Sequence, residues 1–533
     1  MACRVLQFGL LATLFFLTQH ETIAADETTP QYWYDRSQVE LDAALVESQG
    51  FNTNRAEGMI LFIGDGMSVS TVTGVRIWKG QKAGNTGEES KLVYDDFPHF
   101  GYSKTYNTDS QVPDSAGTAT AYLTGVKTKR RVLGLDAGIQ VKNCNSISGH
   151  EVDSILAMVK KNGLPVGIVT TTRITHASPG GAYAHVPHRS WEDDSELPQE
   201  AVDNGCKDIA KQLVKDHDID VILGGGRRRF LMKSQQDETG WAGARSDEDL
   251  IAAWKAKYAN KASAEYITTR DQLLTIDPDD TEYLLGLFGY AELNFDISRT
   301  AKEPTLAEMT EMAIRILQKK STDGRYFLFV EGGRVDHGHH YDQAKFAITD
   351  GLALEAAIAK AKELTTPNTL IALSSDHSHT LSFAGYPKRG NPIFGKIFSD
   401  SYNLPYTTLS YYSGRTALLD VALSFRFNGH RPDVTNVDTE KKSYAQQALV
   451  GTYSATHSGE DVAIFATGPW SHLFHSVHEQ NYIPHVMMFA GCVGDYYDTC
   501  RDSPLISGSL TAEDAAVPAR FRYAAKPKSF TLV

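Results

Sequence analysis

Carboxylate and imidazole side chains gather in four segments of this sequence, each following an apolar run. The segments are Gly64-Asp65-Gly66, His176-Ala177-Ser178, residues 331–340 (Glu-Gly-Gly-Arg-Val-Asp-His-Gly-His-His) and Asp376-His377-Ser378-His379. Carboxylates with imidazoles are typical ligands of Zn²⁺, and carboxylate or hydroxyl oxygens are typical ligands of Mg²⁺. A single Asp after a strand is commonly only a turn residue. The prediction of a metal site therefore depends on several such segments meeting.

A possible nucleophile is Ser115, in the segment Val112-Pro-Asp-Ser-Ala-Gly-Thr-Ala-Thr-Ala. The small residues after it could begin a helix, whose N-terminal end attracts anions through its positive dipole and free N–H groups. Taken alone, Ser115 fits an ordinary helix-capping serine equally well. A zinc ion beside it favours the catalytic interpretation, because metal coordination can hold a serine as its alkoxide.

Short runs rich in β-branched residues predict the strands that position these groups. The runs are Met59–Ile63, Val166–Val169, Val221–Leu223, Tyr326–Val330, Thr369–Leu373 and Val462–Phe465. Helical spacing separates them at Val152–Lys161, Leu306–Leu317 and Ile348–Leu364. This alternation predicts an α/β fold with a doubly wound, largely parallel central sheet flanked by helices. Ligands of such sheets bind beyond the carboxyl ends of the strands, so the candidate groups should share one edge.

Composition limits the classes of protein that the chain can belong to. Hydrophobic residues make up 41% of the 533 residues, which is enough for a large buried core. The formal net charge is −13, and basic runs occur only at Lys127–Arg131 and Arg227–Arg229, so nucleic-acid binding is not expected. Two segments of the expected domain, 26–533, lie outside the alternation. They are a possible amphipathic helix at Gln31–Val46 and an insertion at about 386–448.

The N-terminus has the pattern of a secretory signal peptide, residues 1–25. Arg4 precedes the apolar segment Val5–Leu17, and small residues allow cleavage after Ala24 or Ala25. Export favours disulfide bonds among the four remaining cysteines. The short interval between Cys492 and Cys500 favours a local bridge, which leaves Cys144 to pair with Cys206. Because the charged C-terminus lacks a terminal apolar run, we expect neither a membrane helix nor a lipid anchor, and an extracellular location.

Taken together, six motifs of this chain closely resemble those of animal alkaline phosphatases, in the same order from about Gln31 to Cys500. They are Asp65-Gly-Met, Asp114-Ser115-Ala, the segment from His176 to Arg189, Glu331–His340, Asp376-His377-Ser-His379 and Thr456-His457-Ser-Gly-Glu-Asp461. Separately several of these motifs are weak signals, but their combination is highly specific. The resemblance implies hydrolysis of phosphomonoesters, with broad specificity.

The same resemblance implies three metal ions in each chain. One zinc ion would be bound by Asp336, His340 and His457. A second zinc ion would be bound by Asp65, Asp376 and His377, with Ser115 completing the set. One Mg²⁺ would be bound by Asp65, Ser178 and Glu331. His176 and His337 would orient metal-bound water, and His379 would either join them or have a structural role.

The implied reaction passes through a phosphoserine on Ser115 that water then hydrolyses, while Arg189 grips two phosphate oxygens. Two relatives of this fold are disfavoured. A sulfatase needs a Cys/Ser-x-Pro-x-Arg motif, which is absent around Ser115, and a nucleotide phosphodiesterase usually has a Thr nucleophile and lacks Ser178 and Glu331. A catalytically dead binding protein is disfavoured because no implied catalytic residue is lost.

The chain also departs from the family pattern. Animal members often carry an additional calcium site with an acidic residue directly after a Gly-Leu-Phe stretch. Here Gly289 follows Gly286-Leu-Phe288, so an additional Ca²⁺ is in doubt. Family members form homodimers through an N-terminal helix, a position that Gln31–Val46 would fill. The lipid-anchor tail common in these enzymes is missing, so we expect no membrane anchor.

Overall fold

The computed structural model describes residues 50–261, 263–398, 403–418 and 431–497. The chain divides into two compact units, Met1–Phe51 and Asn52–Val533, and the structure below is that of the second. The predicted signal peptide, the predicted helix Gln31–Val46 and Cys500 lie outside the described residues.

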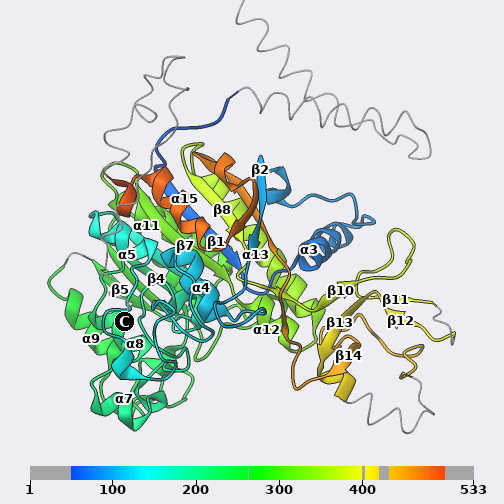
Figure 1. The fold of residues 1–533 in the computed structure, drawn as a ribbon, viewed down its shortest axis with the longest axis horizontal. Coiled ribbons are helices and arrows are strands. Elements are labelled where there is room, and N and C mark those ends of the chain that lie inside the picture. Colours follow the sequence, from blue (N-terminus) through cyan, green and yellow to red (C-terminus); the bar gives the residue numbers. More distant parts are fainter. Residues whose placement is uncertain (1–49, 262, 399–402, 419–430, 498–533) are drawn as a thin grey trace, which may run out of the picture. The chain divides into compact units, whose positions relative to one another are not determined.

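A ten-stranded sheet forms the centre of this unit, in the order β17-β2-β16-β8-β1-β7-β3-β4-β6-β5 (Figure 1). Its central strands are β8 (Leu370–Ser374), β1 (Gly58–Gly64), β7 (Tyr326–Gly332) and β3 (Val166–Arg173), which pair in parallel. Every residue of β1, β7 and β8 is buried. This agrees with the apolar runs that predicted them, since a parallel sheet is covered on both faces. The predicted α/β fold class is confirmed.

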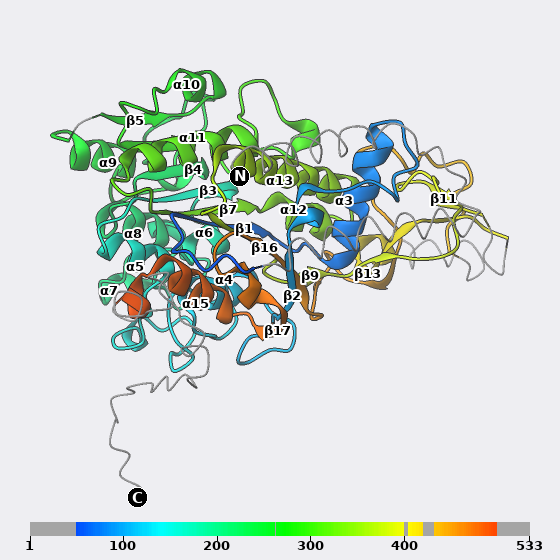
Figure 2. The ribbon, with the colours of Figure 1, turned by 90° about the horizontal axis from the view of Figure 1, so that it is seen from above.

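Helices cover both faces of the sheet (Figure 2). Met59, Leu61 and Ile63 of β1 pack on one side, with α4 (Ser115–Thr124), α5 (Ile155–Lys161), α8 (Ile209–Lys215), α9 (Leu250–Tyr258) and α15 (Tyr482–Gly491). Ile60 and Phe62 point to the other side, with α3 (Val69–Lys82), α11 (Leu306–Lys320) and α13 (Ala344–Leu364). In the described part of the chain, no helix is both long and apolar enough to cross a bilayer.

The six predicted strands are all present, and two features of the sheet were not predicted. The sixth predicted strand, β16 (Val462–Thr467), runs antiparallel to both of its neighbours, β8 and β2 (His99–Lys104). Four strands were not predicted: β2, the edge strands β5 (Ala264–Ile267) and β17 (Ser476–Glu479), and β6 (Tyr283–Leu287), which lies beside the predicted strand β4 (Val221–Gly225). β2, β5 and β17 contain charged or exposed residues. β6 is a buried apolar run, but it has no β-branched residue and contains Gly286.

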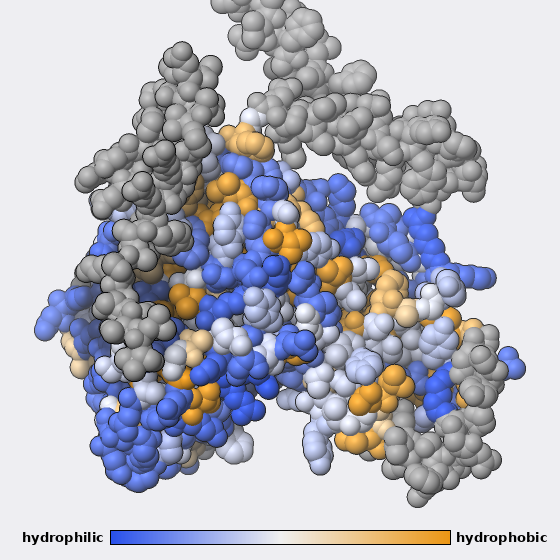
Figure 3. All heavy atoms as spheres, in the orientation of Figure 1, coloured by the Kyte–Doolittle hydropathy of each residue, from blue (hydrophilic) through white to orange (hydrophobic). Residues whose placement is uncertain are grey.

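Two small sheets lie beside the ten-stranded sheet (yellow, Figure 1). One contains β10 (Leu381–Phe383), β13 (Leu409–Gly414) and β14 (Ala448–Gly451), and the other pairs β11 (Lys396–Ile397) with β12 (Tyr406–Thr407). This region includes the described part of the insertion expected at 386–448. Several of its large apolar side chains are exposed, among them those of Tyr386, Phe398 and Leu449. Hydrophobic residues appear on the visible face in separate patches (Figure 3).

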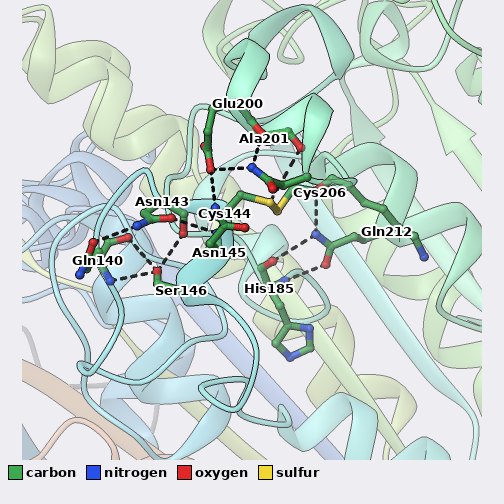
Figure 4. The surroundings of a disulfide bond; sticks show 12 residues. Gln140, Asn143, Cys144, Asn145, Ser146, His185, Glu200, Ala201, Cys206 and Gln212 are labelled. Carbon is green, nitrogen blue, oxygen red and sulfur yellow. Dashed lines mark hydrogen bonds between the residues drawn. A yellow bond between two sulfur atoms is a disulfide. The ribbon is translucent and has the colours of Figure 1, made fainter.

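A disulfide bond joins Cys144 to Cys206, as predicted, with Cα atoms 6.1 Å apart (Figure 4). Cys144 begins the short helix η2 (Cys144–Ser146), and Cys206 follows α7 (Gln199–Asp203). The amide of Asn145 donates to Glu200 of α7, so a polar contact flanks the bridge. The predicted partner of Cys492 is Cys500, which is not among the described residues, and that pairing stays a prediction.

Candidate functional site

The carboxyl ends of three neighbouring strands bring the predicted carboxylates together. Asp65 directly follows β1, Glu331 is the second-last residue of β7, and Asp376 lies two residues after the end of β8. In the sheet, Ile63 of β1 is level with Glu331 on one side and with Ser374 on the other. The strand order therefore places three buried carboxylates at one edge, as the sequence predicted.

Asp65, Asp376 and His377 form a group whose potential ligand atoms all lie within 4.8 Å of one another. The Nε2 atom of His377 is 3.0 Å from Asp376 Oδ2 and 3.2 Å from the hydroxyl oxygen of Ser115. The tight turn at Gly66 has φ +69°, and its N–H donates to Asp376 Oδ1 at 2.9 Å. These are the residues expected to bind the second zinc ion.

Asp336, His340 and His457, the set expected at the first zinc ion, also lie together. His340 Nε2 is 3.3 Å from Asp336 Oδ2 and 3.1 Å from His457 Nε2. His457 arrives through a two-residue antiparallel ladder, in which β15 (His457–Ser458) pairs with β9 (Ser378–His379). His379 contacts Asp336 directly and belongs to a group of potential ligands with Asp336, His377 and His457. This direct contact with a candidate zinc ligand favours a role for His379 in orienting the ligands over a purely structural role.

Asp65 and Glu331 form a third group, which includes His176. Ser178, expected at the Mg²⁺, lies two residues further on in the short helix α6 (Ala177–Gly180), and its side chain is fully buried. His337, expected beside His176, has its ring 5.4 Å away from the His176 ring in a T-shaped arrangement.

Two threonines of β3 hold Glu331, and sequence reasoning missed both. The hydroxyls of Thr170 and Thr172 donate to Glu331 Oε2, the latter at 3.0 Å. Both point to the same face of β3 because side chains alternate along a strand. Thr170 is level with Glu331 in the register of β3 against β7. Threonine is common in strands, so only this register could have revealed the contact.

Ser115 is the first residue of α4, and the residue that caps this helix is Asp114. The Asp114 side chain accepts from the backbone N–H of Gly117, and the exposed fraction of Ser115 is only 1%. The capping role considered for Ser115 is therefore filled by its neighbour. The Ser115 hydroxyl is left at the positive end of the helix, beside the carboxylate and histidine groups.

Arg189 reaches the same place from a loop after α6. Its Nη1 lies 3.3 Å from Asp114 Oδ2, and its Nη2 lies 2.9 Å from His176 Nε2. A cavity of about 810 Å³ opens above these groups. Its lining residues include Ser115, Asp336, His340 and His457 of the predicted site, together with His176, His337, Arg189 and two further arginines, Arg130 and Arg131.

Buried polar atoms without partners suggest what the site is built to bind. Among the described residues, both carboxylate oxygens of Asp65, Glu331 Oε1, Ser178 Oγ and His176 Nδ1 are buried with no hydrogen-bond partner. A buried carboxylate without a partner is costly. A divalent cation bound between these oxygen and imidazole groups would offset that cost. The set of donor atoms fits Zn²⁺ and Mg²⁺.

The pKa directions agree with this interpretation. Burial, followed by the negative charges of Asp376 and Asp336, raises the pKa of Asp65 well above its ordinary value. Burial also raises the pKa of Glu331 to about 7 and that of Asp376 to about 6. Burial lowers the pKa of His377, which keeps the ring neutral and able to donate a lone pair. In the protein alone, several carboxyl groups therefore lie close together with raised pKa values, so that their ionisation is unfavourable.

The segment that departs from the family's calcium pattern is filled by protein groups. A Cβ atom at Gly289 would lie 2.5 Å from the carbonyl oxygen of Glu292, so the backbone leaves no room for a side chain. The buried guanidinium of Arg227 donates to the carbonyl oxygen of Leu287 and to Asp237 Oδ2. A cation supplied by the chain already neutralises the nearby acid, and these groups do not fit a calcium ion.

Comparisons with known proteins agree with the geometry. A family model described as alkaline phosphatase matches residues 56–493. The tissue-nonspecific alkaline phosphatase of Rattus norvegicus is 45% identical over 507 residues, covering 93% of this chain and 95% of that protein. An alkaline phosphatase of Gadus morhua is 46% identical over 479 residues, covering 88% and 98%. In fold, the alkaline phosphatase of the Antarctic bacterium TAB5 is similar, with a TM-score of 0.57, 22% identity, and coverage of 82% and 99%.

Proposed function

The chain belongs to the alkaline phosphatase family, whose members are metal-dependent phosphomonoester hydrolases, and from this premise we propose that Ser115 is its nucleophile. The observation that carries the proposal is the position of the Ser115 hydroxyl. It lies at the N-terminal end of α4, 3.2 Å from His377 Nε2 and in one cavity with Arg189. A serine, an arginine and a group of metal-ligand side chains are the parts that phosphoryl transfer requires.

The proposed reaction has two displacements at phosphorus. In the first, the Ser115 oxygen forms a bond to phosphorus while the bond to the leaving alkoxide breaks, and the alkoxide takes up a proton. In the second, a water oxygen forms a bond to phosphorus, the bond to Ser115 breaks, and the serine recovers its proton. The products are an alcohol and inorganic phosphate, so atoms and charge balance.

Arg189 has the task of binding the phosphoryl group through both displacements. Its planar guanidinium can donate two parallel hydrogen bonds to phosphate oxygens. Asp114 and His176 hold it on two sides, so the fork is oriented before the substrate arrives. Such fixed donors stabilise the charge of the transition state without reorganisation. None of these contacts involves the leaving group, which favours broad specificity.

We assign three metal ions to the carboxylate edge. The first zinc ion would be held by Asp336, His340 and His457. The second would be held by Asp65, Asp376, His377 and Ser115. The magnesium ion would be held by Asp65, Ser178 and Glu331, with His176, His337 and His379 orienting the ligands. When bound, the metal ions lower the pKa of coordinated hydroxyl groups and neutralise phosphoryl oxygens. We assign no calcium ion, because Gly289 supplies no carboxylate and Arg227 already binds the Leu287 carbonyl and Asp237.

We further propose that the mature protein is exported and forms homodimers. The apolar segment after Arg4 and the Cys144–Cys206 disulfide support export, because disulfides persist in oxidising compartments. The family resemblance and the predicted helix Gln31–Val46 support the dimer.

The test of Ser115 is to trap its phosphate. Protein mixed with an aryl phosphate and quenched in acid should carry one added phosphate on the peptide containing Ser115, detected by mass spectrometry. Ser115→Ala should carry none and should lose at least about 10³-fold in turnover, since only residual catalysis remains without a nucleophile. The exposed Ser246, replaced by alanine, is the control and should still be labelled at Ser115. Phosphate on another residue of an active protein would contradict the proposal.

A further inference from the structure

The basic run Lys127–Arg131 ends at the mouth of the catalytic cavity. Arg130 and Arg131 line the same cavity as Ser115 and Arg189. Its volume of about 810 Å³ lies within the range of pockets that bind whole small molecules, roughly 300–1,000 Å³. The cavity is therefore large enough to enclose the leaving group of a substrate as well as the phosphate that is transferred.

Backbone hydrogen bonds tie these two arginines to the groups that bind the transferred phosphate. The N–H of Arg131 donates to Asp114 Oδ1 at 2.7 Å, and its carbonyl accepts from the N–H of Arg189 at 2.7 Å. The N–H of Arg130 donates to Asp109 Oδ1 at 2.9 Å. The loop is thus fixed against the cap of the nucleophile's helix and against the phosphate-binding arginine.

Arg131 adopts a left-handed backbone conformation, with φ +66°. This conformation is unfavourable for a residue that has a side chain, whereas glycine adopts it freely. The fixed backbone holds the side chain of Arg131 at the cavity instead of letting the loop turn away.

Neither guanidinium is neutralised by the protein. Within the described ranges, the side chains of Arg130 and Arg131 form no hydrogen bond or ion pair, and both are exposed. By contrast, the buried Arg227, Arg229 and Arg245 all contact carboxylates, in a chain whose formal net charge is −13. Two unneutralised arginines at the entrance of an anion-binding cavity stand out against that background.

A neighbouring histidine reports the positive potential at this entrance. His188 also lines the cavity, and its pKa is lowered to about 4 by burial and then by the positive charges of Lys142 and Arg131. Arg189 acts in the same direction. A neutral His188 adds no further charge, so the positive charges around it are those of Lys142, Arg131 and Arg189.

We propose that Arg130 and Arg131 bind a second anionic group of the substrate, so that the site favours small phosphomonoesters whose leaving group carries another phosphate. The inference rests on the proposed function, since Ser115 and Arg189 must hold the transferred phosphate. The leaving group then occupies the remaining cavity, where Arg130 and Arg131 can donate charge-assisted hydrogen bonds to its phosphate.

The test compares fructose 1,6-bisphosphate with fructose 6-phosphate as substrates, using initial phosphate release to obtain kcat/KM for each. The variant is Arg130→Gln combined with Arg131→Gly; the glycine accepts φ +66°, so folding is not compromised. We expect kcat/KM for the bisphosphate to fall about tenfold or more, mainly through KM, because each such hydrogen bond contributes about 1.5 kcal/mol or more. For the monophosphate we expect a loss of no more than about threefold from weaker long-range attraction.

The matched control removes two positive charges elsewhere, with Lys91→Gln and Lys319→Gln. Their side chains are 63% and 57% exposed, and neither lines the cavity. This control should leave the preference for the bisphosphate unchanged. Raising the salt concentration should lower the preference of the wild type towards that of the arginine variant, because salt screens exposed charges.

Equal losses for both substrates in the arginine variant, or an equal loss of preference in the control, would overturn the inference while leaving the proposed function intact. Failure of the proposed function would look different: the wild type would release phosphate from neither sugar, or would carry no phosphate on Ser115.

Discussion

Two regions of this molecule bury several charged groups each, and they do so in opposite ways. At the carboxylate edge, Asp65, Glu331 and Asp376 are fully buried beside one another, and no lysine or arginine of the described residues forms an ion pair with them. In the region around residues 192–250, which we call the arginine network, each buried acid meets a basic side chain, a guanidinium in every case except Asp220, which pairs with Lys160 and Lys320. Asp193 pairs with Arg229, Asp208 with Arg245 and Asp237 with Arg227.

The difference explains what each region is for. The pKa of Asp193 is lowered, because its hydrogen bonds and the charge of Arg229 outweigh burial. Burial raises the pKa of Asp208 despite Arg245, and burial together with neighbouring negative charges raises that of Asp65 well above its ordinary value. The acids of the arginine network are paired by groups of the protein itself. The carboxylate edge leaves its acids unpaired, and in our proposal divalent cations from solution neutralise them and take part in binding the phosphoryl group. Buried charge therefore indicates function here only where the protein leaves it unpaired.

The largest expected loss of stability follows from breaking a pair in the arginine network. Arg245 has a fully buried side chain, and two of its nitrogens donate to Asp208 at 2.9 and 3.0 Å. Asp208→Asn removes the counter-charge and should lower the free energy of unfolding by about 3–5 kcal/mol. Denaturant unfolding of the metal-loaded protein measures this. Asp247→Asn is the control, since Asp247 also contacts Arg245 but is 30% exposed and should cost about 1 kcal/mol or less.

A smaller effect is expected from the Cys144–Cys206 disulfide, which borders the arginine network. The bridge closes a loop between residues 62 positions apart, so replacing both cysteines with serine should cost about 2–4 kcal/mol. Turnover of the folded variant at low temperature should be unchanged within about twofold, because no assigned ligand is a cysteine. A variant that stays fully folded but loses most of its turnover would show that the two regions are coupled.

The smallest expected effect is the change in the free energy of unfolding caused by Asp65→Asn. It discriminates best between the two regions, because its sign should depend on whether metal is bound. Asp65→Asn removes one acid from a crowded group, so in metal-free protein it should raise the free energy of unfolding by about 1 kcal/mol. In metal-loaded protein the same change removes a ligand and should lower stability and turnover. Thermal unfolding with and without chelator measures both. Asp208→Asn, the comparison variant, should be destabilising both with and without chelator. If Asp65→Asn were also destabilising in both conditions, the contrast between the two regions would be contradicted.

Much of this architecture could be predicted from the sequence because it depends on local signals. The fully buried strands β1, β7 and β8 are apolar runs, and their carboxyl ends carry the acids at fixed positions. β2 and β17 could not be predicted, since they are partly exposed and mixed in polarity. The antiparallel direction of β16 follows from its pairing with distant strands, which no local pattern encodes.

The parts of the site that escaped prediction depend on long-range contacts. Thr170 and Thr172 hold Glu331 across 161 and 159 positions of sequence, and nothing in a strand-forming threonine signals that role. The basic run ending at Arg131 was visible in the sequence. Its place at the cavity depends on a hydrogen bond from the N–H of Arg189, which belongs to a different loop.

The most direct test of the account is to measure the metal content and the turnover of the same purified samples. Chelator-treated protein, reloaded stepwise, should regain turnover in proportion to bound zinc, reach two zinc ions and one magnesium ion per chain by elemental analysis, and gain thermal stability in parallel, because ions that bind only the folded state stabilise it. Full turnover in protein that retains far less than one zinc ion per chain would contradict the claim that the unpaired carboxylates form a metal-dependent catalytic site.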